Sequence, residues 1–125
     1  MNVPQIYPVT FYKDGNGNSP IREYLKELKT KENKDSRIKS NKIQDYLNAL
    51  RQYGTQVGEP VVKHLVDDIW ELRPLRDRLL FAKWIQGGYI LLHHFIKKTQ
   101  KTPRSEIEQA KRNLEDFTKR SKENA

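Results

Sequence analysis

The feature that most constrains the fold is a pair of adjacent segments, residues 78–85 and 89–96, that are apolar on both faces. In the first segment, RLLFAKWI, one face of an extended strand would carry Leu80, Ala82 and Trp84, and the other Leu79, Phe81 and Ile85. The second segment, YILLHHFI, has a similar composition, and Gly87-Gly88 between the two suits a two-residue hairpin turn. A strand that is apolar on both faces is usually central in its sheet and covered on both sides. We therefore expect this hairpin at the centre of the fold.

Helical patterns lie on both sides of the hairpin in the sequence. SPIREYLKELK predicts a helix with Ser19 as N-cap and Pro20 in the first turn, because apolar residues recur at i, i+3, i+4 and i+7. A second helix is predicted from near Asp35 to Gly54, so the two form an antiparallel helical hairpin. The last helix begins at Thr102-Pro103 or at a capping box, Ser105…Glu108, two alternatives that the sequence leaves open.

Short strands are predicted at YPVTFY (residues 7–12) and in the region after Val61, where VVKHLV and IWELR precede the hairpin. The predicted fold class is α+β: an antiparallel sheet of about four strands with an N-terminal helical hairpin and a C-terminal helix, in the order β-α-α-β-β-β-α. At 125 residues the chain fits a single domain, residues 1–125.

The chain has no cysteine, so neither disulfides nor thiolate metal ligands are available. Its first residues lack the charged and apolar regions of a secretory signal, and no segment reaches the length of a membrane span. We therefore expect a soluble, cytoplasmic protein without membrane contact.

Positive charge is concentrated in one part of the sequence. The net charge is +8, and residues 69–104 hold eight cations and two acids, a net of +6, which leaves +2 for the rest. In an antiparallel meander, the end of one strand lies beside the start of the next. The following residues should therefore converge on one rim of the sheet and form an anion site: Arg73, Arg76, Arg78, Lys97 and Lys98. The alternative is that charged residues simply occupy strand ends.

Other polar residues have less specific interpretations. His93 and His94 lie on opposite faces of one strand, and a buried, hydrogen-bonded histidine is the commoner outcome for each. Glu71 and Asp77 are most simply charge balance within a basic cluster. No histidine pair has metal-ligand spacing, so we predict no metal and no cofactor.

The order of several short motifs resembles the RelE/HigB toxin superfamily, and most closely its phage-derived Gp49-like branch. The matching positions are Glu71-Leu72-Arg73, Arg78, Leu92-His93-x-Phe95-x-Lys97-Lys98, Pro103, Glu106-Ile107 and Ala110. The specific part is residues 61–118. The resemblance implies the toxin of a type II toxin–antitoxin system, a ribosome-dependent endonuclease that cleaves mRNA and inhibits translation. It also implies two kinds of partner: the ribosome with its mRNA, and a cognate antitoxin with a HigA-like helix-turn-helix domain.

Metal-free RNA cleavage requires an aligned 2′-hydroxyl, a stabilised phosphate and a proton transfer. Arg73 and Arg78 suit the phosphate, because a guanidinium binds phosphate oxygens through two N–H groups. Lys97 or Lys98 is the candidate for proton transfer, with His93 as the alternative. The candidate RNA-binding residues are Arg76, Lys101 and Arg104.

The sequence departs from the family at the acid–base positions. Where family members often carry an acid–base residue before the arginines, this chain has Ile69 and Glu71 beside Trp70. The start of the last helix also lacks the tyrosine of RelE. Two other functions fit the same basic rim: a non-catalytic nucleic-acid-binding module, and a phage protein whose task is to bind an acidic protein.

Overall fold

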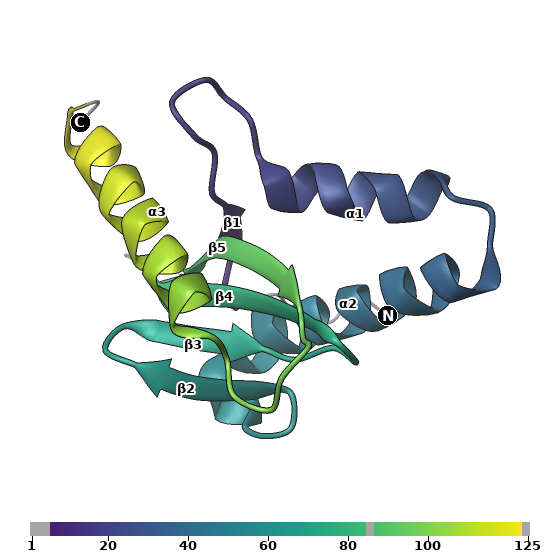
Figure 1. Cartoon of the computed structure of the whole chain (residues 1–125). Coiled ribbons are helices and arrows are strands. Elements are labelled where there is room, and N and C mark those ends of the chain that lie inside the picture. The colour runs from purple at the N-terminus through teal and green to yellow at the C-terminus, as the bar shows by residue number, and fades with distance from the viewer. Residues whose placement is uncertain (1–5, 85–86, 124–125) are drawn as a thin grey trace.

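The structure is a computed structural model that describes residues 6–84 and 87–123 (Figure 1). A short 3₁₀ turn, η1, follows the second helix. The elements are, in order, β1 (Val9–Phe11), α1 (Pro20–Thr30), α2 (Lys34–Tyr53), η1 (Gly54–Val57), β2 (Val62–Val66), β3 (Ile69–Leu72), β4 (Asp77–Lys83), β5 (Tyr89–Ile96) and α3 (Arg104–Glu123).

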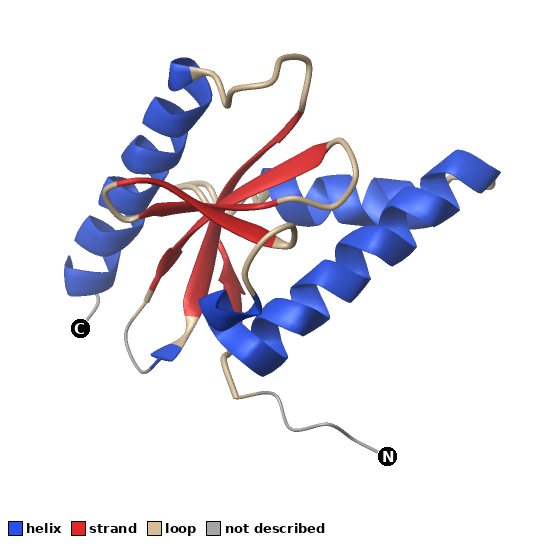
Figure 2. Cartoon of the chain, turned by 90° about the horizontal axis from the view of Figure 1, so that it is seen from below, coloured by secondary structure: helices blue, strands red, loops and turns tan. Residues whose placement is uncertain are grey.

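The strands form one sheet in the order β1-β5-β4-β3-β2, and helices cover both of its faces. Helices α1 and α2 lie on one face and α3 lies on the other, so the sheet is the middle of three layers (Figure 2). Residues 79–82 of β4 are all buried, as the doubly apolar pattern predicts, and the charged residues Asp77 and Arg78 at its start are buried as well. Leu79 and Phe81 pack in the core beside α1 and α2, whereas Leu80 and Ala82 pack in the core beside α3.

The sheet differs from the prediction of about four antiparallel strands. It has five strands, because Val62–Val66 and Ile69–Leu72 are two separate strands joined by a tight turn at Asp67, whose φ is +51°. It is also mixed, because β1 pairs in parallel with β5 while the other pairs are antiparallel. The long α1–α2 excursion lets the chain leave β1 at one edge and return at the opposite edge. Local sequence patterns do not determine that β1 pairs in parallel with β5.

The predicted helix boundaries mostly agree with the structure. Helix α1 begins at Pro20 after Ser19, although the Ser19 side chain makes no capping hydrogen bond. Helix α2 begins one residue before the expected Asp35 and ends at Tyr53, and its C-cap is Gly54, whose φ of +64° favours glycine. Helix α3 begins after Pro103, which selects the first of the two predicted starts. Within the described residues, no helix is both long and apolar enough to cross a membrane.

The connection between the two hairpin strands, residues 84–88, is longer than the predicted two-residue turn at Gly87-Gly88, and residues 85 and 86 of it lie outside the described residues. Strand β4 ends at Lys83 and β5 begins at Tyr89. Trp84 N–H donates a 2.7 Å hydrogen bond to the Gly88 carbonyl across this connection.

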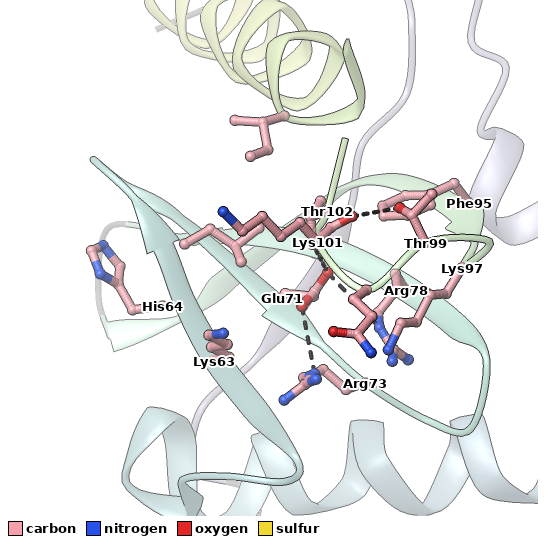
Figure 3. A pocket seen from close by; sticks show the side chains of 13 residues that line it. Lys63, His64, Glu71, Arg73, Arg78, Phe95, Lys97, Thr99, Lys101 and Thr102 are labelled. Atoms are coloured by element: carbon pink, nitrogen blue, oxygen red, sulfur yellow. Dashed lines mark hydrogen bonds and ion pairs between the residues drawn. The ribbon is translucent and has the colours of Figure 1, made fainter. Parts of the chain in front are cut away.

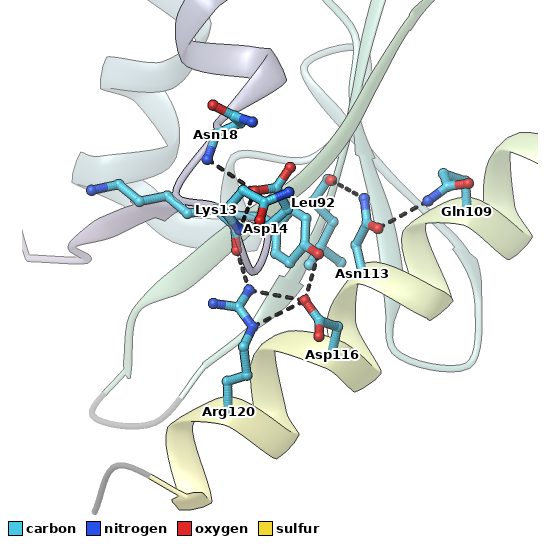
Figure 4. Close-up of polar contacts among 10 residues, drawn as sticks. Lys13, Asp14, Asn18, Leu92, Gln109, Asn113, Asp116 and Arg120 are labelled. Carbon is cyan, nitrogen blue, oxygen red and sulfur yellow. Dashed lines mark hydrogen bonds and ion pairs between the residues drawn. The ribbon is translucent and has the colours of Figure 1, made fainter.

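Polar contacts hold α3 against its face of the sheet (Figure 4). The Asn113 amide donates to the Leu92 carbonyl at 2.8 Å, and the Tyr12 hydroxyl donates to the Asp116 carboxylate at 2.6 Å. Arg120 binds the same carboxylate and also donates to the Lys13 carbonyl. These contacts hold the middle and the last turns of α3. The loop between β5 and α3, residues 97–103, therefore lies at one end of the sheet.

Candidate active site

A buried carboxylate, that of Glu71 on β3, lies at this end of the sheet. Its side chain is 3% exposed and points to the α3 face (Figure 3). The Thr102 hydroxyl donates a 2.5 Å hydrogen bond to Glu71 Oε1. Arg73 Nε lies 3.5 Å from Oε2, and Arg78 Nε lies 3.9 Å from Oε1. Two cations and one hydroxyl therefore compensate the burial of this charge.

The carboxylate forms part of the wall of a pocket of about 270 Å³. Glu71 is its single acid, whereas five of its lining residues are cations: Lys63, Arg73, Arg78, Lys97 and Lys101. Apolar walls come from Leu65, Phe95 and Ile107. One negative charge among five positive charges leaves the pocket strongly cationic, and it therefore suits an anionic ligand.

Strand pairing explains why residues that are distant in sequence meet here. Lys63 pairs with Glu71 across β2 and β3, so both side chains point to the same face. Arg78 pairs with Phe95 across β4 and β5, and Lys97 N–H donates a 2.7 Å hydrogen bond to the Arg76 carbonyl. The end of β3, the start of β4 and the end of β5 thus lie together, as the meander predicts.

The two arginines differ in how free they are to bind a ligand. The Arg78 side chain is 7% exposed, and its Nη1 donates to the carbonyls of Leu75 and Asp77 at 2.7 and 2.9 Å. Burial lowers the pKa of Arg78, and the nearby Glu71 carboxylate opposes that shift. The Arg73 side chain is 25% exposed and forms ion pairs with Glu71 and Glu59 at 3.5 and 3.7 Å. Arg73 is therefore the guanidinium that a ligand can reach more easily.

Not all of the predicted residues line the pocket. Those that do are Arg73, Arg78, Lys97 and Lys101; those that do not are Arg76, Lys98, His93 and Arg104. Arg104 is on the first turn of α3, 92% exposed and paired with Glu108 at 3.4 Å. Arg76 and Lys98 are exposed near the rim without lining the pocket.

His93 and His94 point to opposite faces of β5, as predicted. His93 Nε2 lies 3.4 Å from the Glu106 carboxylate on α3, and the ring lines a different pocket with Tyr12 and Asn113. His94 Nε2 lies 2.9 Å from Asp77 on the helical-hairpin side. The structure therefore separates His93 from the pocket that contains Glu71.

Asp77 is the centre of a second polar cluster, on the face that α1 and α2 cover. Its Oδ1 accepts hydrogen bonds from the Tyr24 hydroxyl and from His94, at 2.6 and 2.9 Å, and Lys39 lies 3.7 Å from Oδ2. Burial alone would raise the pKa of Asp77, but these three neighbours outweigh it and lower the pKa. Burial and the Asp77 carboxylate raise the pKa of Tyr24 well above its usual range. This cluster ties both helices to the sheet.

Sequence reasoning missed three residues of the pocket. Glu71 was interpreted as charge balance, yet it lies at the centre of the ion pairs, and the alternation Trp70-Glu71-Leu72 could have indicated that it faces away from the core beside α1 and α2. Lys63 could have been found from cross-strand pairing with Glu71. Thr102 gives no signal in the sequence, because its role depends on the path of the loop between β5 and α3.

A carboxylate beside several cations can accept a proton while the cations bind a phosphate. No three histidine, aspartate or glutamate side chains are grouped to hold a metal ion within residues 6–84 and 87–123. The constellation offers the groups that a phosphodiester transfer needs: a proton acceptor, phosphate-binding guanidinium groups and ammonium groups.

Comparison with known proteins identifies the family of the chain. Residues 23–115 match the sequence model of a family described as phage-derived protein Gp49-like (DUF891). No curated protein matches the sequence. The match covers most of the chain and contains β2 to β5, the loop after β5 and the first half of α3. The chain therefore belongs to the phage-derived Gp49-like family, a member of the RelE-like toxin superfamily.

Proposed function

We propose that this protein is the toxin of a type II toxin–antitoxin system and that it cleaves mRNA on the ribosome without a metal ion. The observation that supports this proposal most is the pocket around Glu71, where one buried carboxylate lies among five cations. In a pocket that only bound RNA, a carboxylate among the cations would weaken their attraction for phosphate and could serve only to hold the arginines. A nuclease, in contrast, requires a proton acceptor beside the phosphate site.

Arg73 is the proposed phosphate-binding group, together with Lys97 and Lys101. Its guanidinium is partly exposed at the pocket and can bind two phosphate oxygens at once. Arg78 is largely buried and hydrogen-bonded to backbone carbonyls, so its proposed role is to hold the Glu71 carboxylate and add positive potential. These fixed charges stabilise the negative charge that develops on the phosphate during the reaction.

Glu71 is the proposed general base. Its Oε1 accepts the Thr102 hydroxyl, and its Oε2, 3.5 Å from Arg73 Nε, is the proposed acceptor of a proton from the substrate. That proton comes from the ribose 2′-hydroxyl, whose oxygen attacks the adjacent phosphorus and forms a 2′,3′-cyclic phosphate. The bond to the 5′-oxygen breaks, and Lys97, which lines the same pocket, is the proposed proton donor to that leaving oxygen.

The ribosome, mRNA and an antitoxin are the proposed partners. Only a few groups in the pocket can act on the phosphate, so alignment of the 2′-hydroxyl with its phosphorus would come from the ribosome-bound mRNA. A ribosome-active nuclease must be inhibited in growing cells, and a net charge of +8 favours a partner with an acidic contact surface. We propose a co-expressed antitoxin with a helix-turn-helix domain for this role.

Expression in cells followed by sequencing of mRNA 5′ ends tests the proposal. The wild-type protein should create new 5′ ends in register with codons, and Glu71→Gln should not. Lys98→Ala is the matched control, because Lys98 is an exposed cation near the pocket that does not line it. Growth arrest without new 5′ ends would favour the non-catalytic RNA-binding alternative, and normal growth with abundant folded protein would contradict the toxin proposal.

A further inference from the structure

Another pocket lies between α1 and α2, on the flank next to β1. It encloses about 300 Å³, and its floor is apolar. The apolar residues are Phe11, Leu25, Ile43 and Leu47. Ile43 and Leu47 are each 1% exposed and belong to the main core, so the apolar surface that a ligand can reach is that of Phe11 and Leu25. We call this pocket the helical groove.

The rim of the helical groove is cationic. Arg22, Lys26 and Lys29 project from α1, and Arg51 projects from α2 opposite them; none of the residues that line the groove is acidic. The α1 cations follow an i, i+4, i+7 pattern, so they lie along one side of the helix over about 10 Å. Burial lowers the pKa of Arg51, and the groove offers this guanidinium no acidic partner.

The helical groove and the Glu71 pocket are separate surfaces. They share no lining residue, and they belong to opposite faces of the sheet, since the groove lies in the helical hairpin and the pocket lies on the α3 face. Figure 1 shows α1 and α2 antiparallel on the side of the sheet away from α3. The cations of the groove therefore have no part in the proposed cleavage, and a ligand bound there would not occupy the pocket.

We propose that the helical groove binds an acidic, amphipathic segment of a partner protein. Apolar side chains of that segment would contact Phe11 and Leu25, the partly exposed apolar residues of the groove, and its carboxylates would pair with the four cations of the rim. The length of the cationic stripe corresponds to about two turns of a helix.

The groove favours a protein over RNA because it offers no aromatic face on which a base could stack. Its one aromatic residue is Phe11, and the Arg22 guanidinium lies over that ring at 5.4 Å. Single-stranded RNA binds through stacking platforms together with charge. An apolar floor under a cationic rim instead matches the alternating apolar and acidic side chains of an amphipathic peptide.

Selection from a displayed library of random 15-residue peptides tests this inference. The folded wild-type chain is the bait, and Lys26→Glu/Lys29→Glu is the counter-selection bait. Both lysines are exposed and no ion pair involves them within the described residues, so the reversal should leave the fold intact. Circular dichroism checks the fold, and Lys26→Gln/Lys29→Gln replaces the reversal variant if it unfolds. Lys34→Glu/Arg37→Glu, two exposed cations of α2 outside the groove, is the matched charge control.

The expected result is a set of peptides that combine Asp or Glu with regularly spaced apolar residues. In fluorescence anisotropy with labelled peptides, the reversal should weaken binding by about tenfold or more, whereas the control should change it by much less. Binding should also survive Arg73→Ala, so failure of the proposed function would not affect this test.

Two results would overturn the inference. The first is selection of peptides that are not acidic, or of none whose binding depends on Lys26 and Lys29. The second is that Lys26→Glu/Lys29→Glu weakens binding of a labelled 12-nucleotide oligouridine but of no selected peptide. That result would assign the groove to RNA.

Discussion

The Thr102 hydroxyl donates a 2.5 Å hydrogen bond to the buried carboxylate of Glu71, and this contact joins the loop before α3 to the centre of β3. Lys97 and Lys101 are carried by the same loop, so their position at the pocket depends on how the loop is held. The cationic wall and the carboxylate are thus coupled through one hydroxyl group.

Replacement of Thr102 by valine removes that hydroxyl at nearly constant volume. We expect the free energy of unfolding to fall by about 1–3 kcal/mol, because a buried carboxylate loses a hydrogen bond. Cleavage should weaken as well, since the loop that carries two cations is released. Urea denaturation and an RNA cleavage assay measure the two effects. Thr30→Val, which removes an exposed hydrogen bond of α1, is the control and should change stability little; equal effects of the two variants would contradict the coupling.

Substitutions of the two arginines beside Glu71 should affect toxicity and stability to different degrees. Arg73→Ala should abolish toxicity and lower the free energy of unfolding by about 1–2 kcal/mol, less than Arg78→Ala does. The Arg73 side chain is partly exposed and, among the described residues, makes no hydrogen bond to a carbonyl, but it still compensates the buried Glu71 charge. Arg78→Ala should cost about 3 kcal/mol or more, because it leaves the buried Glu71 charge with less compensation and removes two hydrogen bonds to carbonyls. Loss of toxicity in Arg73→Ala that is matched by loss of thermal stability would count against a role in phosphate binding.

Lys97 and Lys98 are adjacent in sequence, but only Lys97 lines the pocket. We expect Lys97→Ala to lower the cleavage rate by about 10²-fold or more, as the loss of a proton donor does. Lys98→Ala should lower it by much less, since Lys98 contributes only through long-range charge. Single-turnover cleavage at saturating protein compares the two. A larger defect in Lys98→Ala would place the proton donor outside the pocket.

Much of the fold could be predicted because it depends on local patterns. Pro20 and Gly54 mark helix boundaries through their own backbone preferences, and the double apolar face of residues 79–82 requires a covered central strand. The parallel pairing of β1 with β5 could not be predicted, because three residues of alternating pattern carry no information about their partner.

The part of the candidate site that lies at strand ends could be predicted from the sequence. Arg73, Arg78 and Lys97 meet because consecutive antiparallel strands return to the same edge. The importance of Glu71 and Thr102 was not predictable, since it depends on burial and on the course of a loop between two elements. His93 illustrates the opposite case: its motif position suggested the site and it shares the α3 face with Glu71, yet it contacts Glu106 and lines a different pocket.

The cluster around Asp77 predicts how stability depends on pH. The folded-state pKa of Asp77 is lowered, so its contribution is present above the unfolded value of about 4 and is lost as pH falls through the folded value. The folded-state pKa of Tyr24 is raised, so its contribution is present below about pH 10 and is lost at higher pH. Urea denaturation from pH 3 to 11 should show the free energy of unfolding falling at both ends of this range. Asp77→Asn should reduce the fall at acidic pH, and Tyr24→Phe should reduce the fall at alkaline pH. An unchanged fall at acidic pH in Asp77→Asn would contradict the assignment.

The most direct test of the central claim is cleavage of a defined mRNA in a reconstituted translation system to which the purified protein is added. The account predicts a cut at one position of the ribosome-bound codon, with a 2′,3′-cyclic phosphate end. It further predicts that a single 2′-deoxynucleotide at the cut site abolishes the cut, and that Glu71→Gln lowers the rate by about 10²–10⁴-fold. Cleavage that persists at the 2′-deoxynucleotide, or a Glu71→Gln protein as active as wild type, would contradict it.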